Sequence, residues 1–112
     1  MYIEIQSKIL IMIWLLLFSS FVKAEQLSAE QIYIQTCFVC HGDDGSGNMP
    51  GVPDLAENKK LMYEENSVIV KRMTSGIQTS GNLSMPAKGG NPDLTDKQLL
   101  SVLVYVKNLL KK

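Results

Sequence analysis

The most informative segment of this 112-residue chain is Cys37-Phe38-Val39-Cys40-His41. Two cysteines separated by two residues and followed at once by histidine form the pattern of covalent haem attachment. One helical turn presents two thiols to the two vinyl groups of haem, and the next residue directs its imidazole at the iron. The motif uses both cysteines and the single histidine of the chain. We therefore expect one haem c, bound through Cys37 and Cys40, with His41 as an iron ligand.

Two other chemistries use a Cys-X-X-Cys pair. A thioredoxin-like redox site requires a βαβ context, and no strand-helix-strand pattern is visible in this sequence. A structural zinc ion requires four ligands, whereas Cys37, Cys40 and His41 supply three at very close spacing. The pattern favours haem over both.

The second axial ligand is a choice among methionines. His41 is the only histidine, so a second imidazole is excluded, and a thioether is the next common partner in electron-transfer haems. Met85 is favoured because it lies in Leu83-Ser84-Met85-Pro86-Ala87-Lys88-Gly89-Gly90, a stiff and then flexible loop. Met73 has the spacing of a core residue on a helix. The other methionines beyond the N-terminal segment, and an open coordination position, remain as alternatives: Met49, Met62 and Met73.

The N-terminal segment has the pattern of an export signal. The stretch from Ile9 to Val22 contains fourteen residues without a charge, which is short for a membrane span but typical of a secretory signal. Val22-Lys23-Ala24 provides a cleavage site after Ala24. We expect residues 1–24 to be a signal peptide and 25–112 to form the domain in the periplasm; an uncleaved anchor is the alternative.

Three helices are expected in the exported part. Ser28 and Gln31 form a capping box for a helix that runs from about Ala29 towards Cys40, and Thr95 and Gln98 repeat the signal for a C-terminal helix. Asn66-Ser67 begins a third helix that ends at Gly76, and a weaker helical turn is expected near Lys59–Glu64. The sequence therefore predicts an all-α domain.

Two long stretches rich in glycine and proline, Gly42–Glu57 and Ile77–Leu94, separate these helices. Loops of this length are uncommon in compact domains unless they are functional. A domain this small often needs a cofactor to complete its core, so both loops are expected to enclose a large apolar ligand.

Charge gives few further indications. Eleven basic residues balance eleven acidic ones, so no broad basic surface for nucleic acid is expected. One set of cations could dock a partner or pair with haem propionates, although a solvated surface is the simpler interpretation: Lys59, Lys60, Lys71, Arg72 and Lys88.

On these motifs the sequence resembles a class I monohaem cytochrome c over residues 25–112. The stretch from Met85 to Leu99 is most similar to the bacterial cytochrome c-five type, although Asn91-Pro92-Asp93 stands where that type often has a second cysteine pair. The resemblance implies that Pro53 supplies the carbonyl that accepts the Nδ1 proton of His41. It also implies that the first and last helices cross, with Ala29 and Tyr33 facing Val102 and Tyr105.

The expected function is one-electron transfer between respiratory redox partners, without catalysis of a bond change. Three alternatives remain: a haem sensor or enzyme with an open axial position, a thiol oxidoreductase, and a redox subunit or N-terminally anchored domain of a larger oxidase or dehydrogenase. Partners are expected to dock transiently, as in small redox encounters.

Overall fold

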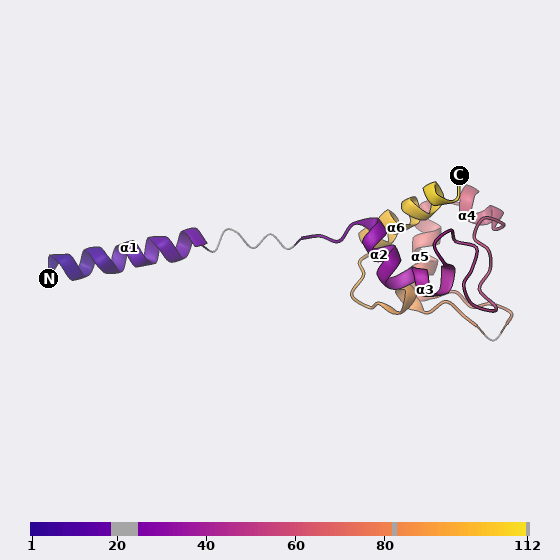
Figure 1. Ribbon diagram of the computed structural model, residues 1–112, viewed down its shortest axis with the longest axis horizontal. Coiled ribbons are helices and arrows are strands. Elements are labelled where there is room, and N and C mark those ends of the chain that lie inside the picture. Colours follow the sequence, from indigo (N-terminus) through magenta and orange to yellow (C-terminus); the bar gives the residue numbers. More distant parts are fainter. Residues whose placement is uncertain (19–24, 82, 112) are drawn as a thin grey trace.

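The protein is described by a computed structural model that covers residues 1–18, 25–81 and 83–111. Within these ranges the regular elements are all helical, which confirms the predicted all-α class (Figure 1). One isolated antiparallel bridge joins Ile77 and Met85. The elements are α1 (Tyr2–Phe18), α2 (Ala29–Ile32), η1 (Tyr33–Cys37), α3 (Phe38–His41), α4 (Lys59–Tyr63), α5 (Asn66–Ser75), η2 (Ala87–Gly90) and α6 (Asp96–Leu109).

The first helix of the domain is continuous through α2, η1 and α3. It begins at the predicted capping box, in which Ser28 Oγ accepts from the Gln31 amide at 3.2 Å and the Ser28 amide donates to Gln31 Oε1 at 2.8 Å. Its middle turn is a π-helix, because the Phe38 amide donates to the carbonyl of Tyr33. No pattern in the sequence predicts this wider turn. Single π turns within α-helices are frequently found at functional sites, and this one ends on Cys37.

The C-terminal helix α6 supplies the centre of the core. Thr95 and Gln98 form the second predicted capping box. Leu99, Val102, Leu103 and Val106 recur at helical spacing and are all buried.

The first and last helices of the domain pack together as expected. α2 contacts α6, and the rings of Tyr33 and Tyr105 lie 5.4 Å apart at an angle of 50°. Tyr33 is 2% exposed and Val102 is 1% exposed, while Ala29 is half-buried at the start of α2. This contact fixes the orientation of the helix that carries the cysteine motif.

Helix α5 closes the core from a third side. Ile69, Val70 and Met73 are buried, and α5 packs on α6. The helix ends at Gly76, as predicted, with φ +85°. A Cβ atom at Gly76 would lie 3.0 Å from the carbonyl oxygen of Met85 and from the amide nitrogen of Ala87, so glycine lets the Met85 loop lie close against the helix end.

The N-terminal helix α1 covers Tyr2–Phe18. Among the residues that the structure describes, no helix has the length and apolar character needed to cross a membrane. The predicted cleavage position after Ala24 falls in residues 19–24, outside the described ranges.

Candidate functional site

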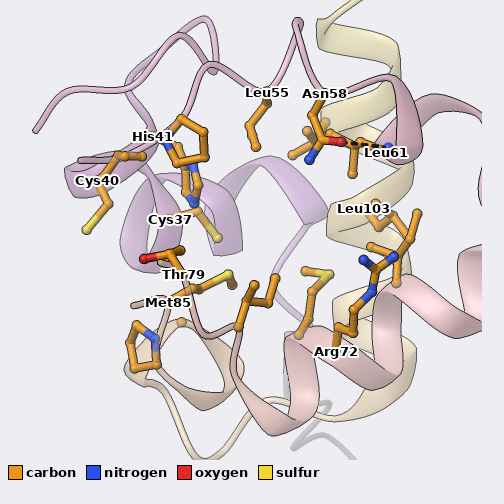
Figure 2. Close-up of a pocket in the computed structure, with 18 of the residues that line it drawn as sticks. Cys37, Cys40, His41, Leu55, Asn58, Leu61, Arg72, Thr79, Met85 and Leu103 are labelled. Carbon is orange, nitrogen blue, oxygen red and sulfur yellow. Dashed lines mark hydrogen bonds between the residues drawn. The ribbon is translucent and has the colours of Figure 1, made fainter. Parts of the chain in front are cut away.

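A cavity of about 270 Å³ opens between the cysteine motif and helices α5 and α6 (Figure 2). Both predicted loops contribute to its walls, which confirms the expectation that they enclose a site. The first loop contributes Gly51, Val52, Pro53 and Leu55 to the lining. The second loop contributes Ile77, Thr79, Leu83, Ser84, Met85, Pro86 and Gly89. The walls are mainly apolar, as expected of a site that holds a large apolar ligand.

The two cysteines lie at one end of this cavity. Cys37 ends the π turn and Cys40 lies on α3; both are half-buried and neither forms a disulfide. Figure 2 shows the Cys37 side chain beside the cavity and Cys40 at its edge. Burial, with a smaller contribution from Cys40, raises the pKa of Cys37 to about 11. The protonated form is a poor nucleophile, which disfavours the thiol oxidoreductase alternative.

His41 lies on the cavity wall beside the cysteines (Figure 2). Burial lowers the pKa of its imidazole, and the neutral ring is the form that ligates metals. Its Nδ1 atom is buried and has no hydrogen-bond partner among the described residues. Pro53 lines the same cavity, but the expected hydrogen bond from His41 Nδ1 to its carbonyl is not formed in this structure and stays a prediction.

Met85 lies across the cavity from His41 (Figure 2). Its backbone is fixed by two hydrogen bonds: the Met85 amide donates to the Ile77 carbonyl and the Ile77 amide donates to the Met85 carbonyl, both at 2.9 Å. The sequence did not predict this bridge, which holds an otherwise irregular loop in place. Of the other three candidates, Met73 also lines the cavity but is a buried core residue of α5, whereas Met49 and Met62 are not among the lining residues.

Two close contacts join the cysteine helix to the rest of the site. Gly89 has φ +64°, and a Cβ atom there would lie 2.9 Å from Thr36 Cγ2, so glycine permits the Met85 loop to approach the π turn. The Tyr33 hydroxyl donates to the carbonyl of Gly42 at 2.7 Å in a buried environment. Burial is the main cause that raises the pKa of Tyr33 to about 12. This bond secures the backbone immediately after His41.

The opposite end of the cavity is polar. Asn58 and Arg72 lie away from the cysteines, and Lys60 also lines the cavity (Figure 2). Arg72 forms an ion pair with Glu64. In the sequence these residues have no spacing that sets them apart from an ordinary solvated surface.

The residues present fit a covalently attached haem. The cavity places two thiols, one imidazole with an unpartnered buried nitrogen and one thioether around an apolar space. A thiol pair with a neighbouring histidine is the donor set of c-type attachment, and a thioether is a common second ligand to such haems.

Fold, motif and donor set together define a class: a class I monohaem cytochrome c. The family described as cytochrome c oxidase, cbb3-type, subunit III matches residues 24–106, and the chain belongs to this family. Membership confirms the resemblance found in the sequence. It also implies a covalently bound haem c and a role as a haem electron carrier.

Similar proteins fall into two groups. Cytochrome c-555 of Prosthecochloris aestuarii is 28% identical over 87 residues, covering 72% of this chain and 84% of that protein. Cytochrome c-555 of Chlorobaculum thiosulfatiphilum is 34% identical over 74 residues, covering 66% and 84%. The cbb3-type cytochrome c oxidase subunit FixP of Bradyrhizobium diazoefficiens is 30% identical over 77 residues, covering 68% of this chain but 25% of that subunit. No solved structure gives a significant match.

Proposed function

We propose that this protein is an exported one-electron carrier whose haem is attached through Cys37 and Cys40 and ligated by His41 and Met85. The observation that carries the proposal is the meeting of all four side chains at one cavity. The haem supplies an iron that gains and loses a single electron, and the partners are redox proteins of a respiratory chain.

Each residue has a separate task in this proposal. Cys37 and Cys40 would hold the haem through covalent bonds, which would prevent its dissociation. Lowering of the His41 pKa keeps its imidazole neutral and ready to ligate, and a hydrogen bond from Nδ1 to the Pro53 carbonyl would orient the ring. Met85 supplies a neutral sulfur that raises the reduction potential. The apolar walls exclude water, so little solvent reorganises when the charge on the iron changes.

The proposal makes the protein a carrier without enzymatic activity of its own. If His41 and Met85 both hold the iron, no coordination position would be left for oxygen or peroxide. A sensor or haem enzyme would need one position open. Carbon monoxide binding to the reduced protein separates the two cases: slow or absent binding supports a carrier, and rapid binding supports an open site.

Residues 1–24 supply the route of export in this proposal, with cleavage after Ala24 and a periplasmic product. The length of the uncharged stretch supports a signal rather than a span. The intact mass of protein isolated from its native host tests this: a chain beginning at Glu25 is expected, and a chain that retains residues 1–24 would indicate an anchored domain.

A second candidate is a redox subunit of a larger oxidase or dehydrogenase. It is favoured by the similarity to FixP and to CcoP of Rhodobacter capsulatus, which is 32% identical over 88 residues. This chain spans 28% of that CcoP and 84% of cytochrome c-555 of Prosthecochloris aestuarii. Purification from native membranes distinguishes them, because a subunit would co-purify with its complex.

The decisive test of the proposal uses protein produced with a haem-attachment system. We expect haem staining on a denaturing gel and a redox titration that follows a one-electron Nernst curve. A Cys37→Ala, Cys40→Ala double variant provides the unstained control. Absence of stain from the wild-type band would overturn the proposal.

A further inference from the structure

Arg72 presents an unsatisfied donor at the polar end of the cavity. It lines the cavity from α5, and its Nε atom is buried without a hydrogen-bond partner among the described residues. A buried donor on a charged group is costly unless an acceptor meets it, and the cost is greater than for a neutral group. The position therefore points to an anionic acceptor inside the cavity.

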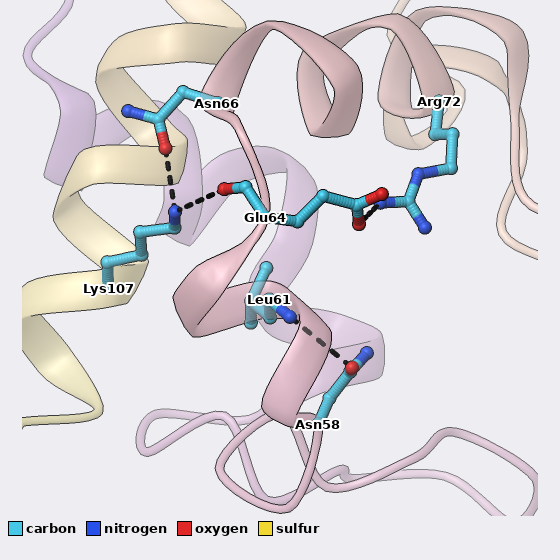
Figure 3. Close-up of polar contacts among 6 residues, drawn as sticks. All are labelled: Asn58, Leu61, Glu64, Asn66, Arg72 and Lys107. Atoms are coloured by element: carbon cyan, nitrogen blue, oxygen red, sulfur yellow. Dashed lines mark hydrogen bonds and ion pairs between the residues drawn. The ribbon is translucent and has the colours of Figure 1, made fainter.

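The terminal nitrogens of the Arg72 guanidinium already have a partner, because one of them pairs with the carboxylate of Glu64. Glu64 pairs with Arg72 through its carboxylate, and its backbone carbonyl accepts from Lys107 Nζ at 3.4 Å (Figure 3). Lys107 also donates to Asn66 Oδ1 at 2.7 Å. These contacts fasten the corner between α4 and α5 to α6. The Arg72 side chain is 42% exposed and that of Glu64 31%, so their pairing contributes little to stability, and orientation of the guanidinium is its main effect.

The chemistry of haem supplies the matching anion. Its two vinyl groups lie on one edge of the ring and its two propionate carboxylates lie on the opposite edge. The cysteines hold the vinyl edge at one end of the cavity, while Arg72 lies at the other end (Figure 2). The carboxylates are thereby directed to the end that carries Arg72.

We propose that Arg72, oriented by Glu64, donates its Nε–H to a haem propionate and so stabilises the reduced form of the protein. The proposal rests on the proposed function, because it requires haem attached at Cys37 and Cys40. The charged groups around this position are Glu64 as the paired anion, Lys60 as a second cation on the cavity wall, and Lys107, which is bonded to the carbonyl of Glu64. A hydrogen bond to an ionised acceptor is short and strong, so arginine specifies the position of that carboxylate.

Loss of this cation should lower the reduction potential. A positive charge near the ring favours the form with the additional electron, and in a cavity of low dielectric this effect is only partly screened. For Arg72→Gln we expect a two- to tenfold shift of the redox equilibrium towards the oxidised form, or about 18–59 mV for one electron. Arg72→Lys should restore most of the potential, because it returns the charge.

The test is an equilibrium redox titration at pH 8 and low salt, with Lys71→Gln as the matched control. Lys71 is the neighbouring residue on α5, is exposed and does not line the cavity, so it removes the same charge from solvent. Arg72→Gln must shift the potential clearly more than Lys71→Gln. Equal shifts in variants that retain stained haem would overturn the role of Arg72 alone, whereas an unstained wild-type band would overturn the proposed function as well.

A measurement on the wild-type protein covers the case in which the Arg72 variants fail to fold. In the reduced, ¹⁵N-labelled protein we expect a nuclear Overhauser contact between the Arg72 Nε–H proton and a propionate methylene of the haem. A resolved Nε–H resonance with no such contact would contradict the proposal.

Discussion

The two walls that face each other across the cavity are built in different ways. His41 lies on a continuous helix that begins at a capping box and packs on α6. Met85 lies in a loop that is fixed by a two-bond bridge to Ile77 and by close contacts at two glycines. We call the side that carries Cys37, Cys40 and His41 the cysteine wall, and the loop around Met85 the methionine wall. The cysteine wall is determined by local sequence, whereas the methionine wall depends on contacts between distant segments.

Removing the cysteine wall should have the largest effect. In the Cys37→Ala, Cys40→Ala variant no thioether can form, and we expect the domain of residues 25–112 to be largely disordered because haem completes its core. Circular dichroism during heating should show no cooperative transition. A cooperative transition in the haem-free variant would show that the helices fold without the cofactor.

Removing the thioether of Met85 should change the ligation of the iron while the protein stays folded. We expect Met85→Ala to retain stained haem, lower the reduction potential and bind carbon monoxide rapidly when reduced, because the thioether ligand is lost. Met73→Leu is the control: it conserves volume in the core and should cost less than about 1.5 kcal/mol while leaving the potential nearly unchanged. The reverse pattern would make Met73 the ligand.

The contact between the two walls can be tested at Gly89. An alanine there adds a Cβ atom 2.9 Å from Thr36 Cγ2 at a positive φ, so we expect Gly89→Ala to lower the free energy of unfolding by about 1–3 kcal/mol. Gly81→Ala is the control, because its nearest contact is Thr79 Oγ1 at 3.9 Å. Denaturant titration measures both, and equal stabilities would show that the loop does not press on the π turn.

The smallest expected change in stability concerns the hydrogen bond that secures the backbone after His41. Tyr33→Phe removes the buried bond to the Gly42 carbonyl and should cost about 1–2 kcal/mol; Tyr63→Phe, at a side chain that is 87% exposed, should cost almost nothing.

The same residue predicts a pH dependence. The folded pKa of Tyr33 lies near 12, above its ordinary value of 10.0. The neutral phenol is therefore favoured by folding, and the stabilisation present below pH 10 should be lost between about pH 10 and 12. Denaturant titrations across this range should show a shallower decline for Tyr33→Phe than for the wild type. Parallel curves would exclude Tyr33 as the cause.

Much of this molecule could be predicted from local signals. Capping residues located the starts of α2 and α6, the spacing of Leu99, Val102, Leu103 and Val106 gave the buried face, and the cysteine motif gave the attachment end. These features depend on residues within a few positions of each other.

Features that depend on distant segments could not be predicted. The π turn follows from how the helix packs, and the Ile77–Met85 bridge follows from the closure of a loop. The position of Arg72 in the cavity requires α5 and α4 to meet at Glu64, which no spacing in the sequence encodes.

In the proposed carrier, His41 and Met85 bind the same haem iron. A direct test is the absorption spectrum of the ferric, haem-loaded protein, because an iron–sulfur bond gives a weak far-red band. We predict that the wild-type protein shows this band and that Met85→Ala loses it. A wild-type spectrum with covalent haem but without the band, or a Met85→Ala variant that retains it, would contradict the account.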